Sequence, residues 1–133
     1  MPSNLEIIPE HLLQRDLNTF EAGVARLRRV LGAAWVVTDA DEVARRSRDT
    51  TPHSHAPSAF VYPGSREEVQ AVVRIAAEYG LPLWPCSRGK NWGYGAATPA
   101  RDGAIIVVLE RMNRILEVNE ELAYAVIEPG VTY

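Results

Sequence analysis

The sequence predicts an α+β domain that contains a βαβ unit and a mixed β-sheet. Three observations support this fold class: apolar residues three and four apart between Leu13 and Leu31, a strand-helix-strand pattern over residues 59–84, and an aliphatic run over residues 104–109. The chain has 133 residues, 47% of them hydrophobic. A domain of this length can bury a sizeable core.

The composition argues against nucleic-acid-binding and membrane-spanning proteins. With 14 basic and 17 acidic residues and a net charge of −3, the chain lacks the basic surface expected of a nucleic-acid binder. Its longest aliphatic run is far shorter than the ~20 residues that span a bilayer, and its first residues lack a basic leader. We therefore expect a cytoplasmic protein with neither nucleic-acid nor membrane partners. Cys86 is the only cysteine, so no internal disulfide can form, and we expect it to be a buried packing residue.

The N-terminal third is predicted to be helical. The stripe from Leu13 to Leu31 indicates an amphipathic helix, with a capping box at Asn18 and Glu21 and a stop at Gly32. A second, short helix is expected from about Asp39 to Arg46. We place a boundary in the irregular stretch that follows, between a helical lead-in (1–48) and the first part of the main domain (49–133).

His53 and His55 stand in that irregular stretch. Two imidazoles could approach one metal ion, but no third ligand stands at a suitable spacing, and zinc sites need three or four. We therefore interpret both as loop histidines and predict no metal site. A role for either histidine near a bound cofactor stays open.

The main domain begins with the βαβ unit. Residues 59–62 are a predicted strand, and Ser65 with Glu68 forms a capping box that opens a helix ending at Gly80. A second strand over residues 81–84 contains Pro82, which is tolerated at a sheet edge. The simplest arrangement is a right-handed parallel crossover.

Three further strands are predicted beyond residue 100. The run over residues 104–109 is typical of a strand covered on both faces. Residues 115–118 and 124–127 follow as two more strands. Because the sequence stops where Pro129-Gly130 should open a new element, we expect the front part of a longer protein.

The stretch from Pro85 to Gly95 carries three glycines together with Arg88 and Lys90. Glycines let successive N–H groups turn to one side, so this composition favours an anion site. It is not a P-loop, because Asn91 follows Gly89-Lys90, and it is not a Rossmann fingerprint, because residues 96–99 lack helical periodicity. An ordinary glycine-rich surface turn is the alternative.

Three motifs carry a family resemblance. Residues 87–99, 111–118 and 128–133, in this order and spacing, closely resemble the vanillyl-alcohol oxidase and 4-cresol dehydrogenase flavoproteins, especially the bacterial eugenol oxidases. The resemblance implies the N-terminal part of a PCMH-type FAD-binding domain. It also implies FAD as cofactor and, for the longer protein, a substrate domain beyond residue 133.

The resemblance assigns cofactor contacts to two segments. In the family the glycine loop wraps the FAD pyrophosphate, and a second turn, in which Gly130 lets the dinucleotide approach closely, also contacts FAD. The residues implied are Ser87, Arg88, Gly89, Lys90, Asn91, Trp92, Gly93 and Gly95 from the loop, and Pro129, Gly130 and Val131 from the turn.

Tyr94 resembles the family tyrosine that binds the phenolic oxygen of the substrate. The implied reaction is hydride transfer to FAD from a para-substituted phenol of the 4-hydroxybenzyl alcohol, vanillyl alcohol, eugenol or cresol type. No histidine occurs over residues 85–95, so covalent flavin attachment from this loop is not expected. The resemblance leaves open the electron acceptor, O₂ or a cytochrome partner, and assembly into a homo-oligomer. The alternative from another class is a truncated, non-catalytic nucleotide- or anion-binding module.

Overall fold

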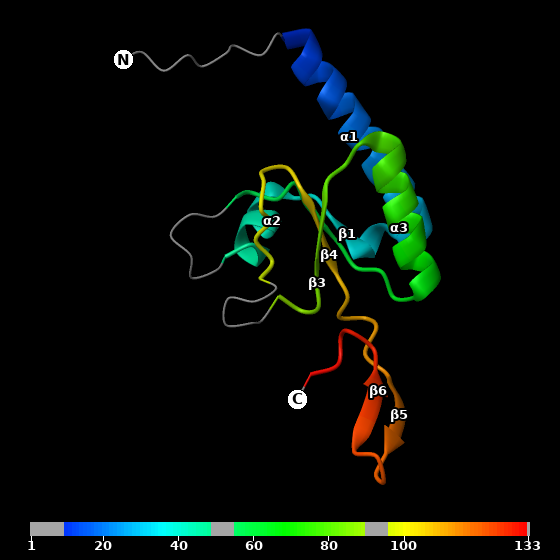
Figure 1. The fold of residues 1–133 in the computed structure, drawn as a ribbon. Coiled ribbons are helices and arrows are strands. Elements are labelled where there is room, and N and C mark those ends of the chain that lie inside the picture. The colour runs from blue at the N-terminus through cyan, green and yellow to red at the C-terminus, as the bar shows by residue number, and fades with distance from the viewer. Residues whose placement is uncertain (1–9, 49–54, 90–95, 133) are drawn as a thin grey trace.

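The computed structural model of the protein describes residues 10–48, 55–89 and 96–132 (Figure 1). The elements in chain order are α1 (Glu10–Leu31), the 3-10 helix η1 (Ala33–Trp35), β1 (Val36–Val37), α2 (Ala40–Arg46), β2 (Ala59–Val61), α3 (Arg66–Tyr79), β3 (Leu83–Cys86), β4 (Ile105–Val108), β5 (Ile115–Asn119) and β6 (Tyr124–Ile127).

Four strands form one mixed sheet in the order β1-β2-β4-β3. The strands β2 and β3 both run parallel to β4, and β1 pairs antiparallel with β2. The predicted βαβ unit is thus confirmed as β2-α3-β3, but its two strands are not neighbours, because β4 lies between them. The α+β class and the mixed sheet are confirmed as well.

The strand β4 is buried on both faces, as its aliphatic run predicts. Ile105 and Val107 pack into a cluster with residues of α1 and α3, whereas Ile106 and Val108 pack into a second cluster with Phe60 of β2. This split follows from the period of two along a strand. Figure 1 shows α1 and α3 lying together beside the sheet, well away from α2.

The helix α1 begins upstream of the predicted start. Because it runs from Glu10, Asn18 lies in its interior, and the predicted capping box of Asn18 with Glu21 is wrong. The helix extends to the N-terminal side of Asn18, so Asn18 and Glu21 have the spacing of a capping box but lie within the helix. The predicted stop at Gly32 is confirmed: α1 ends at Leu31, and Gly32 has φ 91°.

The predicted N-terminal caps of α2 and α3 are present, although only one of the two bonds of the predicted capping box at Ser65 and Glu68 forms. The Asp39 side chain accepts a hydrogen bond from the Glu42 amide at 2.9 Å, and the Ser65 side chain accepts one from the Glu68 amide at 3.2 Å. The Glu68 carboxylate accepts from the Gly64 amide, at 2.6 Å, rather than from Ser65. Both N-termini therefore begin where the cap residues predict.

The strand β3 begins two residues later than predicted, at Leu83. Gly80 ends α3 in the left-handed conformation, with φ 64°, and the Leu81 amide donates to the Ala76 carbonyl at 2.8 Å. This motif closes the helix, so Leu81 is committed to the cap and not to the sheet. Pro82 therefore precedes the strand, and within the described part of the sheet β3 pairs only with β4.

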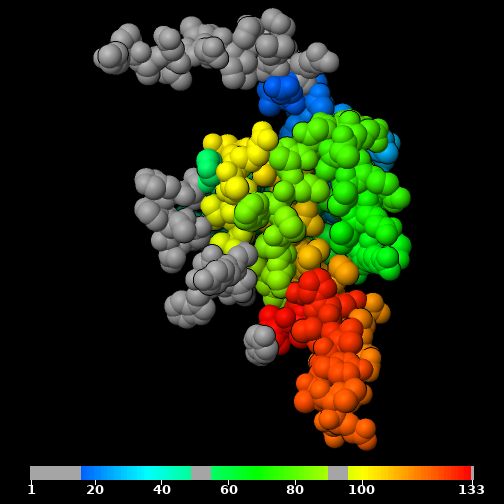
Figure 2. All heavy atoms as spheres, in the orientation of Figure 1, coloured from blue at the N-terminus to red at the C-terminus, as the bar shows by residue number. Residues whose placement is uncertain are grey.

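The strands β5 and β6 form a separate antiparallel hairpin, which projects from the body of the molecule (Figure 2). Both strands were predicted within one residue of their observed ends. Among the described residues, no helix has the length and apolar character required to cross a bilayer. The cytoplasmic location stays a prediction.

Candidate cofactor-binding site

The glycine loop begins at the carboxyl end of β3 and leads to β4, as predicted. Its first residues are anchored to the sheet, because the Leu109 amide donates to the carbonyls of both Cys86 and Ser87 at 3.0 Å. Gly89 adopts φ 68°, a left-handed conformation that L side chains rarely take. Predicted site residues Lys90, Asn91, Trp92, Gly93, Tyr94 and Gly95 lie outside the described residues.

The structure joins the two predicted cofactor segments directly. The Ser87 hydroxyl donates to the Pro129 carbonyl, and Arg88 Nε donates to the Gly130 carbonyl at 2.9 Å. Residues that are far apart in the sequence therefore form one surface beyond the strand ends. The roles of Ser87, Arg88 and Pro129 as cofactor ligands stay predictions.

Gly130 is also packed against the backbone of the chain itself. A Cβ at this position would lie 2.5 Å from the Leu109 carbonyl oxygen and 2.7 Å from that of Met112. The Gly130 amide donates to the Met112 carbonyl at 2.7 Å, and the Val131 amide donates to the Glu128 carbonyl at 3.1 Å. The backbone after β4 lies so close to residue 130 that only glycine fits there. This requirement holds whether or not a dinucleotide also approaches Gly130, as the family resemblance predicts.

A buried carboxylate holds the base of the hairpin next to this turn. Glu128 is 8% exposed and accepts hydrogen bonds from Arg114 at the backbone amide (2.8 Å), Nε (3.0 Å) and an NH₂ group (2.7 Å). The side-chain and backbone donors of Arg114 lower the pKa of the Glu128 carboxyl. Glu128 was not predicted as a site residue, because nothing in the spacing of Arg114 and Glu128 distinguishes it from a surface acid.

The lowered pKa of Glu128 gives a pH prediction. A depressed carboxyl pKa contributes stability at neutral pH that is lost as the pH falls through the folded-state pKa. We expect Glu128→Gln to increase amide hydrogen exchange over Tyr124–Ile127 at neutral pH, and the difference from the native protein to shrink on acidification. Glu121→Gln, which changes an exposed acid of the same hairpin, is the control. An equal effect of both variants at every pH would contradict the role of Glu128.

A pocket of about 230 Å³ opens at the carboxyl ends of the parallel strands. Phe60 and Val108 lie in its wall from the sheet, and its polar lining comes from Arg46, Tyr62, Arg88, Gly89 and Glu110. In open α/β sheets ligands bind outside this edge. Of the predicted site residues, Arg88 and Gly89 lie at the pocket, whereas Arg46, Tyr62 and Glu110 were not predicted.

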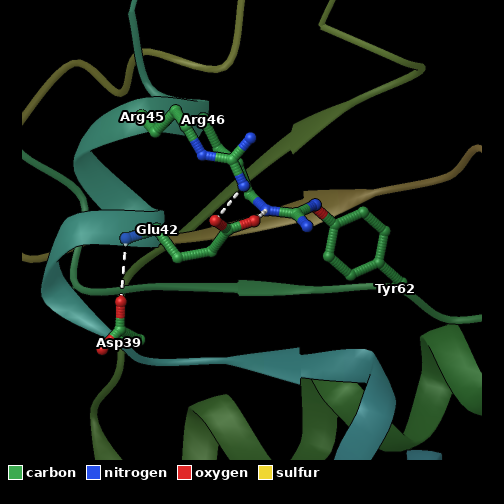
Figure 3. A network of polar contacts seen from close by, with 5 residues as sticks. All are labelled: Asp39, Glu42, Arg45, Arg46 and Tyr62. Atoms are coloured by element: carbon green, nitrogen blue, oxygen red, sulfur yellow. Dashed lines mark hydrogen bonds and ion pairs between the residues drawn. The ribbon is translucent and has the colours of Figure 1, made fainter.

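Arg46 belongs to a polar network on α2 (Figure 3). Its Nε donates to Glu42 at 2.5 Å, and another of its nitrogens donates to the Tyr62 hydroxyl. Arg45 pairs with the same Glu42 carboxylate. Hydrogen bonds from Arg45 and Arg46 lower the pKa of Glu42, and burial raises the pKa of Tyr62.

Cys86 and His55 lie in different surroundings. Cys86 is buried, as predicted, and burial together with the nearby Glu110 raises the pKa of its thiol to about 11, so it is protonated and unreactive at neutral pH. His55 is exposed, with Nδ1 3.3 Å from an Asp102 oxygen. Within residues 10–48, 55–89 and 96–132, no three His, Cys, Asp or Glu side chains gather as a metal site. His53 lies outside the described residues.

The arrangement fits a phosphate-bearing cofactor. Among the described lining residues of the pocket are two guanidinium groups, the left-handed Gly89 and the carboxylate of Glu110, and one of the guanidiniums also pairs with Glu42. Guanidinium groups and backbone N–H groups are the usual donors to phosphate oxygens. Arg46, Arg88 and Gly89 are therefore the described residues that would hold a diphosphate.

Comparison with known proteins gives related flavoproteins. The sequence model of the FAD binding domain family matches residues 57–133. A 1'-carboxy-chondrochloren decarboxylase from Chondromyces crocatus is 54% identical over 112 residues, which cover 84% of this chain and 21% of that protein. The 4-cresol dehydrogenase (hydroxylating) flavoprotein subunit of Pseudomonas putida is 36% identical over 133 residues, which cover 98% of this chain and 25% of that protein.

Two solved structures of related flavoproteins have a similar fold. A p-cresol methylhydroxylase with substrate bound superimposes with a TM-score of 0.81 at 38% identity, over 86% of this chain and 23% of that one. An isoeugenol complex of 4-ethylphenol oxidase from Gulosibacter chungangensis gives 0.76 at 41% identity, again over 86% of this chain and 23% of that one. The chain thus spans about a fifth to a quarter of the length of these relatives.

The predicted resemblance and the predicted cofactor are confirmed by these matches. The chain belongs to the FAD-binding domain family of flavoproteins, it is related to the flavoprotein subunit of 4-cresol dehydrogenase, and its cofactor is FAD.

Proposed function

We propose that this chain is the FAD-binding part of an oxidoreductase that acts on para-substituted phenols. The observation that carries the proposal is the likeness to two solved enzymes, named for p-cresol and 4-ethylphenol, at TM-scores of 0.81 and 0.76. Both named compounds are phenols with an alkyl group para to the hydroxyl. An alkylphenol or the corresponding benzylic alcohol is therefore the substrate class that the proposal predicts.

FAD, when bound, supplies a hydride acceptor. The part of this chain is to bind and orient it. Ser87 and Arg88 of the loop are bonded to the carbonyls of Pro129 and Gly130, so the two segments form one surface. The amides of Gly130 and Val131 are used within the chain, so we assign the backbone N–H donors of a diphosphate to the glycine loop and not to this turn. Removing the phenolic proton makes the para benzylic carbon a better hydride donor, so a donor to the phenolic oxygen assists the transfer.

The proposal is tested by oxidation of 4-cresol and 4-hydroxybenzyl alcohol in protein that carries this chain. Reduction of the flavin is followed by its absorbance under anaerobic conditions, and the methyl ethers of both compounds serve as controls. We expect the free phenols to reduce the flavin and the methyl ethers to leave it oxidised. Bound flavin that no phenol reduces would leave the non-catalytic nucleotide-binding module as the better description.

Tyr94 is the proposed donor to the phenolic oxygen, by family resemblance, since it lies outside the described residues. We expect Tyr94→Phe to lower kcat/KM for 4-hydroxybenzyl alcohol, with flavin content unchanged. The decrease should correspond to a loss of ~2–4 kcal/mol of transition-state stabilisation. Tyr124→Phe is the matched control, because Tyr124 lies on the exposed hairpin, where its hydroxyl contacts Glu117. Unaltered kcat/KM in Tyr94→Phe would remove this residue from the proposed substrate site.

A second candidate function follows from the 54% identity to 1'-carboxy-chondrochloren decarboxylase. On this alternative, the protein that carries the chain removes a carboxyl group from a phenolic substrate. Release of CO₂ from a carboxylated para-hydroxyphenyl compound distinguishes the two candidates. The corresponding methyl ester, which cannot lose CO₂ directly, is the control.

A further inference from the structure

We infer that Arg46 of α2 is a cationic ligand for the diphosphate of FAD, beside the glycine loop. This inference rests on the proposed cofactor site and extends it to a helix that precedes residues 57–133, the part matched by the FAD-binding family. The family match gives no reason to expect a contact from α2. In the structure, however, Arg46 from the end of α2 lies in the wall of the pocket beside Arg88 and Gly89.

Arg46 and the glycine loop line the same pocket. The pocket of about 230 Å³ has Arg46 in its wall together with Arg88 and Gly89, and Tyr62 and Glu110 complete its polar lining. Arg46 comes from the C-terminal end of α2, whereas Arg88 and Gly89 follow β3. Two distant segments therefore bring guanidinium groups to one space at the carboxyl edge of the sheet.

The side chain of Arg46 is held in place before any ligand arrives. Glu42 accepts from its Nε at 2.5 Å, and the Tyr62 hydroxyl accepts from another nitrogen, while the guanidinium carbon lies 5.4 Å from the Tyr62 ring centroid. Tyr62 itself is 5% exposed and therefore fixed by the core. A preorganised donor loses less side-chain entropy when it binds, so its contact contributes more to affinity.

The charges at the pocket select the ligand class. Arg46 and Arg88 outnumber the carboxylate of Glu110 among the described lining residues, and the Glu42 carboxylate that pairs with Arg46 is not one of them. A guanidinium presents a planar set of N–H donors that matches phosphate oxygens. A diphosphate suits two guanidiniums approaching from different segments better than a neutral or cationic ligand does.

The neighbouring Arg45 provides a matched control. Both arginines lie in the last turn of α2 and pair with the Glu42 carboxylate. The described lining of the pocket includes Arg46 but not Arg45. Arg45→Gln and Arg46→Gln therefore remove the same charge and an ion pair with the same partner. Only the second also removes a pocket donor and the contacts with Tyr62, and Arg46→Lys restores the charge at this position.

The experiment measures affinities of the full chain for FAD, ADP and riboflavin in the native protein and in Arg46→Gln, Arg46→Lys and Arg45→Gln. We expect Arg46→Gln to weaken FAD and ADP binding about tenfold, since a hydrogen bond to a charged group is lost. Riboflavin, which has no phosphate, should bind all variants equally. Arg46→Lys should recover part of the loss, and Arg45→Gln should resemble the native protein.

A second measurement does not depend on the folding of any variant. In the native chain, titration with millimolar ADP is followed by the NMR signals of the Arg46 Nε–H group and the Gly89 amide. We expect both signals to shift together and riboflavin to shift neither. A shift of the Gly89 signal without a shift of the Arg46 signal would overturn the inference and leave the proposed cofactor site intact. If neither signal shifts, both the inference about Arg46 and the proposed cofactor site are wrong.

Inorganic phosphate separates the two sources of the same chemistry. If Arg46 binds the cofactor diphosphate, phosphate competes with FAD, and Arg46→Gln weakens both. If phosphate shifts the Arg46 signal equally with and without saturating FAD, the pocket holds a separate anion, and the assignment to the cofactor is wrong.

Discussion

Replacing Gly89 with valine is expected to abolish FAD binding. Gly89 has φ 68°, and a Cβ built there would lie 3.1 Å from the Ala97 Cβ, tighter than ordinary contact. A β-branched residue is strongly disfavoured in the left-handed region, so the loop must change its path at the pocket. The loop N–H groups that we propose as donors to the diphosphate would then turn away. Flavin absorbance of the purified variant, relative to protein, measures the loss.

Gly103→Val is the control for the same substitution elsewhere. Gly103 also has positive φ, 78°, but no atom lies within 4 Å of a Cβ built there. It precedes β4 and therefore lies at the opposite edge of the sheet from the pocket. We expect this variant to lose stability and keep its flavin. Normal flavin content in Gly89→Val would show that the loop does not contact the cofactor as proposed.

Local sequence signals predicted most of the fold. Glycines and capping residues placed the ends of α2 and α3 correctly, because these signals act within one helical turn. The aliphatic run of β4 predicted burial on both faces, since each face needs its own apolar residues. The prediction for α1 went wrong at Asn18, where a residue pair typical of a cap lies inside a longer helix.

The strand order could not be predicted by the same means. The βαβ pattern gave the direction of β2 and β3, but the insertion of β4 between them depends on contacts distant in sequence. The same limit applies to the pocket. The composition of the glycine loop indicated an anion site. Arg46 and Glu110 are distant from the loop in sequence and come to lie at the same pocket only in the folded chain, so the sequence did not indicate them.

The contact between the glycine loop and the turn at Pro129-Gly130 is the clearest example. The family resemblance implied that both segments contact FAD, yet it gave no direct bond between them. The Arg88 side chain, predicted as a phosphate ligand, donates to the Gly130 carbonyl through Nε, which makes the position of this turn depend on the loop. An effect of Gly130 on FAD binding therefore has a physical path that does not need a direct contact with the cofactor.

Gly130→Ala is expected to separate this turn from the segment after β4. The added Cβ would lie 2.5 Å from the Leu109 carbonyl oxygen, 2.7 Å from that of Met112 and 2.9 Å from the Glu110 Cα. All three are backbone atoms, so no side-chain rotation relieves the overlap. The hydrogen bonds from the Gly130 amide to Met112 and from Arg88 to the Gly130 carbonyl would be lost as the turn moves. Overpacking of this kind costs roughly 1–3 kcal/mol, measured by chemical denaturation.

Gly64→Ala separates overlap with backbone from overlap with a movable side chain. A Cβ at Gly64 would lie 2.6 Å from the Arg111 Cζ, a side-chain atom, so the overlap is relieved when this guanidinium moves and gives up its hydrogen bond to the Tyr62 carbonyl. We expect Gly64→Ala to lose stability but keep its flavin, whereas Gly130→Ala should also bind FAD more weakly and exchange its hairpin amides faster. Equal flavin affinity and equal exchange in the two variants would contradict a role for the packed turn in shaping the site.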